Sequence, residues 1–155
     1  MTNNDIIRRL RYTFDYDDST MISIFMLADF SVTRTQISGW LKPDSNPDSV
    51  ECEDQELAHF LNGLIIKMRG KKDGPQLEPE KKLTHNITFK KLKIALNLKS
   101  EDILDIMKLA DFKMSVHELS AFFRKPGNKH YRQCGDQIMR NFLQGLQMKL
   151  RPDDK

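Results

Sequence analysis

The chain has 155 residues, of which 39% are hydrophobic and 30% charged, and its formal net charge is +3. This composition is typical of a folded protein and excludes a chain that is disordered throughout. No apolar run is long enough to span a membrane, and the N-terminus lacks the basic and apolar segments of a signal peptide. We therefore expect a cytoplasmic protein that has no membrane partner.

The charge is distributed unevenly along the chain. Residues 1–69 carry 7 Lys and Arg against 11 Asp and Glu, whereas residues 85–155 carry 14 against 8. A basic half beside an acidic half indicates either an anionic partner for the second half or attraction between the halves.

A tandem repeat dominates the sequence: residues 4–69 recur without a gap, 82 positions later, at residues 86–151. Apolar residues within each copy follow helical spacing, and no segment shows the alternation of a half-buried strand. We predict an all-α protein, a tandem duplication of a roughly four-helix unit whose two copies pack with pseudo-twofold symmetry. The predicted organisation is a first helical repeat over 1–69, a linker over 70–84 that is rich in Gly, Pro and Lys, and a second helical repeat over 85–155.

The first two helices of each repeat are predicted from caps and apolar stripes. Asn4 and Asn86 are candidate N-caps of the first helices, because their side-chain oxygens can accept from free backbone N–H groups. The second helices, at about 19–29 and 101–111, follow. The first of them is apolar nearly all round, which predicts a central, buried helix.

The third and fourth helices have clearer signals. Thr33 with Gln36, and Ser115 with Glu118, have the spacing of a capping box, and the helix in the second copy is expected to continue through Phe122 and Phe123. The fourth helices have long apolar stripes: Leu57, Phe60, Leu61, Leu64 and Met68, and Met139, Phe142, Leu143, Leu146 and Leu150.

Each fourth helix contains a glycine, Gly63 or Gly145. A glycine inside a helix costs about 1 kcal/mol relative to alanine, so something must compensate. We expect the close approach of another backbone, with the sister helix of the other repeat as a candidate. Room for a ligand is the alternative.

Three cations recur at matching positions of the two first helices. They are expected on the solvent side, where they could meet phosphates, although a merely solvated helix face has the same pattern. The candidate binding residues are Arg8, Arg9, Arg11, Lys90, Lys91 and Lys93.

Residues 28–41 resemble a helix-turn-helix, in which Arg34, Thr35 and Gln36 would face the bases. The match is incomplete, because the turn is short and lacks glycine. A buried helix hairpin explains the same spacing, and the negative charge of the first repeat argues against DNA contact there.

The sequence contains no recognisable catalytic, metal or cofactor motif. Cys52 and Cys134 lie at equivalent positions, and no histidine accompanies both, so we expect buried, free thiols and not activated nucleophiles. The cysteines and histidines lack zinc-ligand spacing, and both glycine-rich nucleotide-binding patterns are missing. We predict no metal and no cofactor.

Several motifs together resemble one known family. They are Asn4-Asp5-Ile6-Ile7-Arg8-x-Leu10-Arg11-Tyr12, Phe60-Leu61-Asn62-Gly63-Leu64-Ile65, Leu77-Glu78-Pro79-Glu80, Lys90-Lys91-Leu92-Lys93-Ile94-Ala95-Leu96 and Cys134-Gly135-Asp136-Gln137. The chain resembles the bacterial YehS-like proteins along nearly its entire length. The resemblance implies a cytosolic bacterial protein with a duplicated domain, and it transfers no functional residues because the family has no established activity.

Together these observations favour a non-enzymatic helical binding module with a protein or anionic partner. The alternative is a nucleic-acid-binding regulator that uses the basic first helices or the helix-turn-helix-like hairpin. An enzyme is the third hypothesis. It would require a concave pocket that holds several polar groups with perturbed pKa values.

Overall fold

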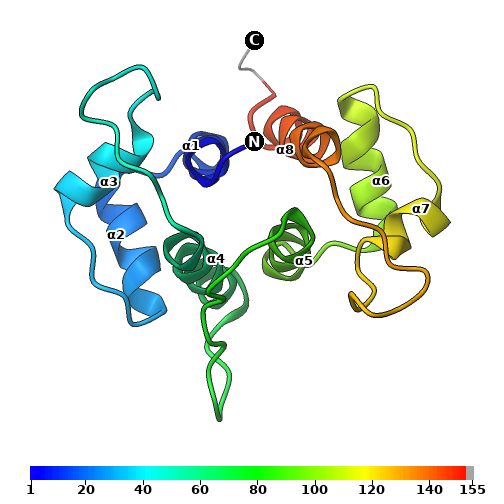
Figure 1. Cartoon of the computed structure of the whole chain (residues 1–155), viewed down its shortest axis with the longest axis horizontal. Helices are drawn as coiled ribbons and strands as arrows, with labels where there is room; N and C mark the ends of the chain where they lie inside the picture. The colour runs from blue at the N-terminus through cyan, green and yellow to red at the C-terminus, as the bar shows by residue number, and fades with distance from the viewer. Residues whose placement is uncertain (153–155) are drawn as a thin grey trace. The chain divides into compact units, whose positions relative to one another are not determined.

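The computed structural model describes residues 1–152, which divide into two compact units, the first over Met1–Leu83 and the second from Thr84 onward. Within the described residues each unit has four helices and no strand, which confirms the predicted all-α duplication (Figure 1). No helix in this part of the chain has the length and hydropathy needed to cross a membrane. The helices are α1 Asn3–Phe14, α2 Asp18–Leu27, α3 Arg34–Leu41, α4 Asp54–Arg69, α5 His85–Ala95, α6 Ser100–Leu109, α7 Val116–Ala121 and α8 Asp136–Leu150.

Threonines cap the first helix of each unit. The Thr2 hydroxyl accepts from the Asp5 backbone N–H at 3.1 Å, and the Thr84 hydroxyl accepts from Ile87 N–H at 3.2 Å. The prediction that Asn4 and Asn86 are the caps is wrong. A cap side chain must stand just outside the helix to reach the free N–H groups, whereas both asparagines lie within the first turn and are buried.

Both predicted capping boxes are confirmed. Gln36 N–H donates to the Thr33 hydroxyl, and Thr33 N–H donates back to Gln36 Oε1. Ser115 and Glu118 make the same reciprocal pair. Helix α7 nevertheless ends at Ala121, earlier than predicted. The N–H groups of Phe122 and Phe123 bond to carbonyls three residues back, as in a tighter 3₁₀ turn.

An aromatic cluster fills each unit, but a different helix supplies its centre. Phe25 of α2 lies 5.5 Å from Trp40 and 5.4 Å from Phe60, measured between ring centroids. In the second unit Phe89 of α5 occupies the centre, 4.6 Å from Phe142 and 5.0 Å from Phe123. The two units therefore have the same order of helices, but different helices supply the central aromatic side chain of the core.

The expected burial of α2 on all sides is wrong. Met21, Ile24 and Phe25 are buried, but Met26 is 50% exposed and Leu27 is 40% exposed. The last residues of the α4 and α8 stripes, Met68 and Leu150, are also exposed. These four apolar side chains lie near the C-terminal ends of their helices, and each is only partly covered.

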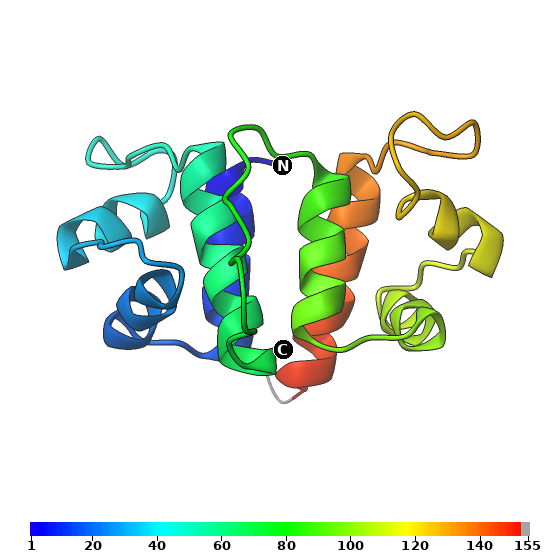
Figure 2. The ribbon, with the colours of Figure 1, turned by 90° about the horizontal axis from the view of Figure 1, so that it is seen from below.

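The mid-helix glycines permit close packing between helices of the same unit. A Cβ at Gly63 would overlap the carbonyl oxygen of Ile24 and lie 2.8 Å from its carbonyl carbon. A Cβ at Gly145 would meet Ile106 in the same way. The predicted close backbone approach is confirmed, but the neighbour is α2 or α6 of the same repeat, so the sister-helix prediction is wrong. Figure 2 shows α2 crossing α4.

We predict that Gly63→Ala and Gly145→Ala each lower the free energy of unfolding by more than about 1 kcal/mol, because an added Cβ forces the crossing helices apart. Helix propensity alone would have the opposite sign. Urea unfolding measures the change. Gly127→Ala is the matched control, since no atom lies within 4 Å of its added Cβ. Unchanged or increased stability in both helix variants would contradict this packing.

Candidate functional site

A buried asparagine holds the long loop that follows the third helix of the second unit. The Asn86 side-chain amide donates to the carbonyl oxygens of Phe122 at 3.0 Å and Arg132 at 2.8 Å. Its Oδ1 accepts from Cys134 N–H at 2.8 Å. One side chain on α5 therefore fixes the backbone at both ends of residues 122–134.

Asn4 makes the same three bonds in the first unit. Its amide donates to the carbonyls of Trp40 and Val50, and its Oδ1 accepts from Cys52 N–H. Asn4 is 5% exposed and Asn86 is 6% exposed. Loss of these bonds would leave buried backbone groups without partners, so the asparagines are structural anchors of the loops.

The loops also share their internal backbone bonds. Asn128 Oδ1 accepts from His130 N–H, and Asn46 Oδ1 accepts from Asp48 N–H, both at 2.8 Å. Arg132 N–H bonds to the Ala121 carbonyl at 3.1 Å, and Val50 N–H bonds to the Gly39 carbonyl at 2.9 Å. The two loops thus have the same pattern of backbone hydrogen bonds.

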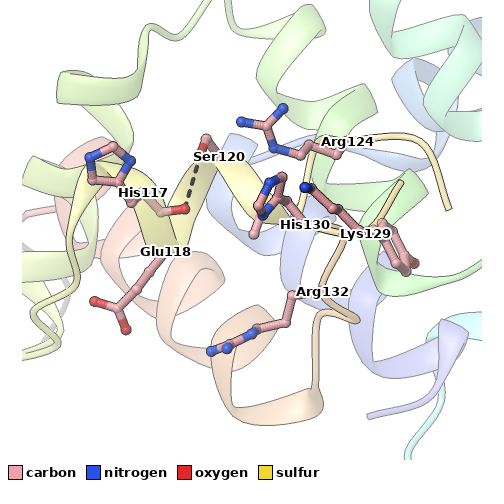
Figure 3. A pocket seen from close by; sticks show the side chains of 9 residues that line it. His117, Glu118, Ser120, Arg124, Lys129, His130 and Arg132 are labelled. Carbon is pink, nitrogen blue, oxygen red and sulfur yellow. Dashed lines mark hydrogen bonds between the residues drawn. The ribbon is translucent and has the colours of Figure 1, made fainter. Parts of the chain in front are cut away.

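A groove lies between the third helix and this loop in each unit. The groove of the second unit has a volume of about 560 Å³, and the groove of the first has about 700 Å³. In the second unit α7 and the loop supply the lining (Figure 3): His117, Glu118, Ser120, Ala121, Arg124, Lys129, His130, Tyr131 and Arg132. In the first unit the lining is Asp18, Arg34, Thr35, Ser38, Gly39, Lys42, Pro47, Asp48, Ser49 and Val50.

The two grooves differ in charge, although their backbones match. The lining of the second groove contains three cations, Arg124, Lys129 and Arg132, and a single carboxylate, that of Glu118. In the first, two cations are balanced by Asp18 and Asp48. The four consecutive loop residues Pro47-Asp48-Ser49-Val50 correspond to Lys129-His130-Tyr131-Arg132. We therefore take the basic groove of the second unit as the candidate site.

Glu118 is already committed to the helix start. Its carboxylate accepts from Ser115 N–H at 2.9 Å. That backbone bond, a side-chain bond with Ser115 and the charge of Arg132 lower the pKa of Glu118, so the group stays ionised near neutral pH. The Arg and Lys side chains of the groove are exposed and thus accessible to an anion.

The predicted binding residues of the first helices do not form one exposed face. Lys91 is only 6% exposed, so its expected solvent position is wrong. Arg8 bonds to the Asp5 carboxylate and the Lys42 carbonyl, both at 2.7 Å, and ties α1 to the end of α3. Arg9 is partly buried, and that burial lowers its pKa, while Arg11 is also partly buried.

Lys90 is exposed, and Lys93 Nζ lies 4.8 Å from the centroid of the Phe123 ring. Helical periodicity shows on which side of the helix a cation lies relative to the apolar stripe. It does not show whether other parts of the protein cover that side. A binding role for the first-helix cations stays a prediction.

The helix-turn-helix residues are partly engaged within the first unit. Gln36 turns back to cap α3, so its side-chain oxygen is engaged in the absence of a partner, and its base-facing role stays a prediction. Arg34 donates to the Ser19 hydroxyl at 2.8 Å and lies 3.9 Å from the Asp18 carboxylate. Thr35 is exposed and lines the groove of the first unit.

Both cysteines are free and buried, as predicted. Desolvation is the main cause that raises the pKa of each thiol to about 12, with further contributions from nearby carboxylates. The thiols are thus poor nucleophiles at neutral pH. In the described part of the chain, no three His, Cys, Asp or Glu side chains are placed to hold a metal ion.

Comparison with known proteins identifies the family. The family described as "Protein of unknown function (DUF1456)" matches residues 3–70 and again residues 85–151. "Uncharacterized protein YehS" of Escherichia coli (strain K12) is 42% identical over 147 residues, which cover 94% of each chain. No solved structure matches significantly. The chain belongs to the DUF1456 family, and the resemblance to YehS-like proteins is confirmed.

The groove itself was not predicted, although its signal is present in the sequence. Identities between the repeats pointed to the core and to the asparagines. The loop cations are found at positions where the two repeats differ, because the first repeat has Pro47 and Val50 where the second has Lys129 and Arg132.

We predict that Asn4→Ala and Asn86→Ala each destabilise the protein by about 2 kcal/mol or more, because three backbone groups, two of them in buried bonds and one in a partly buried bond, lose their partner. Of the two, only Asn86→Ala should shift the NMR amide signals of residues 124–132. Urea unfolding and amide spectra give the two measurements. Asn141→Ala, on the partly exposed face of α8, is the control. A cost below about 0.5 kcal/mol in both anchor variants would show that the asparagines do not hold the loops.

Proposed function

We propose that the protein is a cytoplasmic, non-enzymatic helical binding module whose second repeat engages an anionic partner through the groove between α7 and residues 124–132. One observation carries the proposal. On loops with the same backbone bonds, a neutral groove in the first repeat corresponds to a basic groove in the second. A change of side chains on a fixed backbone is typical of a binding loop on a rigid scaffold.

The charges of the groove support an anionic partner. Arg124 and Arg132 can each present a planar fork of N–H donors to phosphate or carboxylate oxygens. Lys129 adds a third exposed cation. The surrounding second half, with 14 Lys and Arg against 8 Asp and Glu over residues 85–155, would attract such a partner from a distance.

The two cysteine thiols and the Glu118 carboxylate support a binding role over catalysis. The two cysteine thiols are buried with raised pKa values and lie outside the groove lining. The groove's carboxylate, Glu118, is held in the capping box of α7. A general acid or base needs a pKa near the working pH. Burial raises the pKa values of the two thiols, and hydrogen bonding lowers the pKa of Glu118, so all three pKa values move away from neutral pH.

We expect Arg124→Ala/Lys129→Ala/Arg132→Ala to weaken binding of inorganic tripolyphosphate by about tenfold, from roughly 0.5 kcal/mol for each exposed charge contact. Isothermal titration calorimetry at low salt measures this affinity. Unfolding should be nearly unchanged, since these side chains are exposed.

The control Lys71→Ala/Lys72→Ala/Lys82→Ala removes the same charge from exposed positions between the repeats. It should change the affinity much less. The proposal fails if tripolyphosphate does not bind, if the groove variant binds as tightly as the parent protein, or if both variants lose affinity equally.

A further inference from the structure

The basic groove of the second repeat offers little apolar surface for a protein partner. Of its lining residues, Ala121 and Tyr131 are the two whose side chains are mainly apolar. Protein–protein interfaces have an apolar core in which charged residues are depleted. The groove has the opposite composition, with charged and polar side chains along both of its walls.

The cations are spread along the groove, and all three lie on the loop that follows α7. Arg124 follows the end of α7, whereas Lys129 and Arg132 lie on the returning loop (Figure 3). All three are exposed, and no single enclosed point collects them. This arrangement fits a chain of phosphates, whose charges are also spread out, better than it fits one small anion.

Tyr131 adds an aromatic surface at the same place. It lines the groove, is partly exposed, and is held through its backbone N–H, which donates to the Asn128 carbonyl at 3.0 Å. Within the described chain no aromatic ring or cation stacks on the Tyr131 ring. The first repeat has Ser49 at this position, and Pro47 and Val50 at the positions of Lys129 and Arg132. The aromatic ring and these two cations therefore occur together in one repeat and are missing together from the corresponding loop.

We infer that the partner is single-stranded nucleic acid, with its phosphates on Arg124, Lys129 and Arg132 and a base stacked on Tyr131. This inference rests on the proposed function and names its partner. A cationic groove beside an aromatic ring is the combination that binds single strands without regard to sequence. A duplex would satisfy the cations but would keep its bases away from Tyr131.

The test uses fluorescence anisotropy with a labelled single strand of about twelve nucleotides and mixed sequence, as DNA and as RNA. Tyr131→Leu should weaken binding of the single strand about fivefold or more, and Tyr131→Phe should leave it unchanged. Tyr131→Leu should weaken tripolyphosphate binding much less than it weakens binding of the single strand. The Arg124→Ala/Lys129→Ala/Arg132→Ala variant should weaken binding of both ligands, and it should lower the salt slope of single-strand binding by about 1 for each cation that contacts a phosphate.

Photo-crosslinking of the unmodified protein to the single strand, followed by mass spectrometry, provides a readout that does not depend on the folding of any variant. A nucleotide adduct on Tyr131 supports the inference, and adducts only elsewhere overturn it. Tighter binding to a duplex of the same sequence, or equal loss of tripolyphosphate binding in Tyr131→Leu, also overturns it.

The two proposals fail separately. If tripolyphosphate binds in the groove but the single strand does not, the nucleic-acid inference is wrong and the anion-binding function stands. If an acidic polyglutamate peptide outcompetes the single strand in the groove, the partner is a protein. If no anion binds in the groove, both proposals fall.

Discussion

The structure depends on one interaction that occurs twice: a buried asparagine in the first helix that binds three backbone groups of a distant loop. Asn86 holds the carbonyls of Phe122 and Arg132 and the N–H of Cys134, and Asn4 holds their counterparts. An amide side chain offers two donors and an acceptor, and these bonds use all of them. A loop anchored at both ends can therefore keep its path while its exposed side chains change.

That separation between anchor and surface links the fold to the candidate function. The glycines at 63 and 145 let the second and fourth helices of each repeat cross closely, and the asparagines then tie the first helix to the loop. Neither device involves the side chains that line the groove. The substitutions from Pro47 to Lys129 and from Val50 to Arg132 can therefore convert a neutral surface into a basic one without disturbing the core. The binding chemistry changes while the backbone bonds remain.

The parts of this structure that sequence reasoning predicted are those governed by local rules. Capping boxes at Thr33 and Ser115 need only a spacing of three residues, and helix-period stripes located the fourth helices. Asn4 was misinterpreted because an asparagine near a helix start has the same local pattern whether it caps the helix or binds a distant loop. The burial of Lys91 and the aromatic centre at Phe89 depend on tertiary packing, which periodicity does not contain. The groove is lined by α7 and by a loop, and periodicity does not show that their side chains share one surface. Its positive charge comes from positions at which the two repeats differ.

The most direct measurement would transfer the groove's chemistry to the other repeat. The variant Pro47→Lys/Asp48→His/Ser49→Tyr/Val50→Arg places the second repeat's loop side chains on the first repeat's backbone, where Lys42 already corresponds to Arg124. Calorimetric titration with tripolyphosphate gives the number of sites per chain. If the anchored loop is a shared scaffold and its side chains select the ligand, the variant should have one more site than the parent protein and similar stability. An unchanged number of sites in a variant of parental stability would contradict the account.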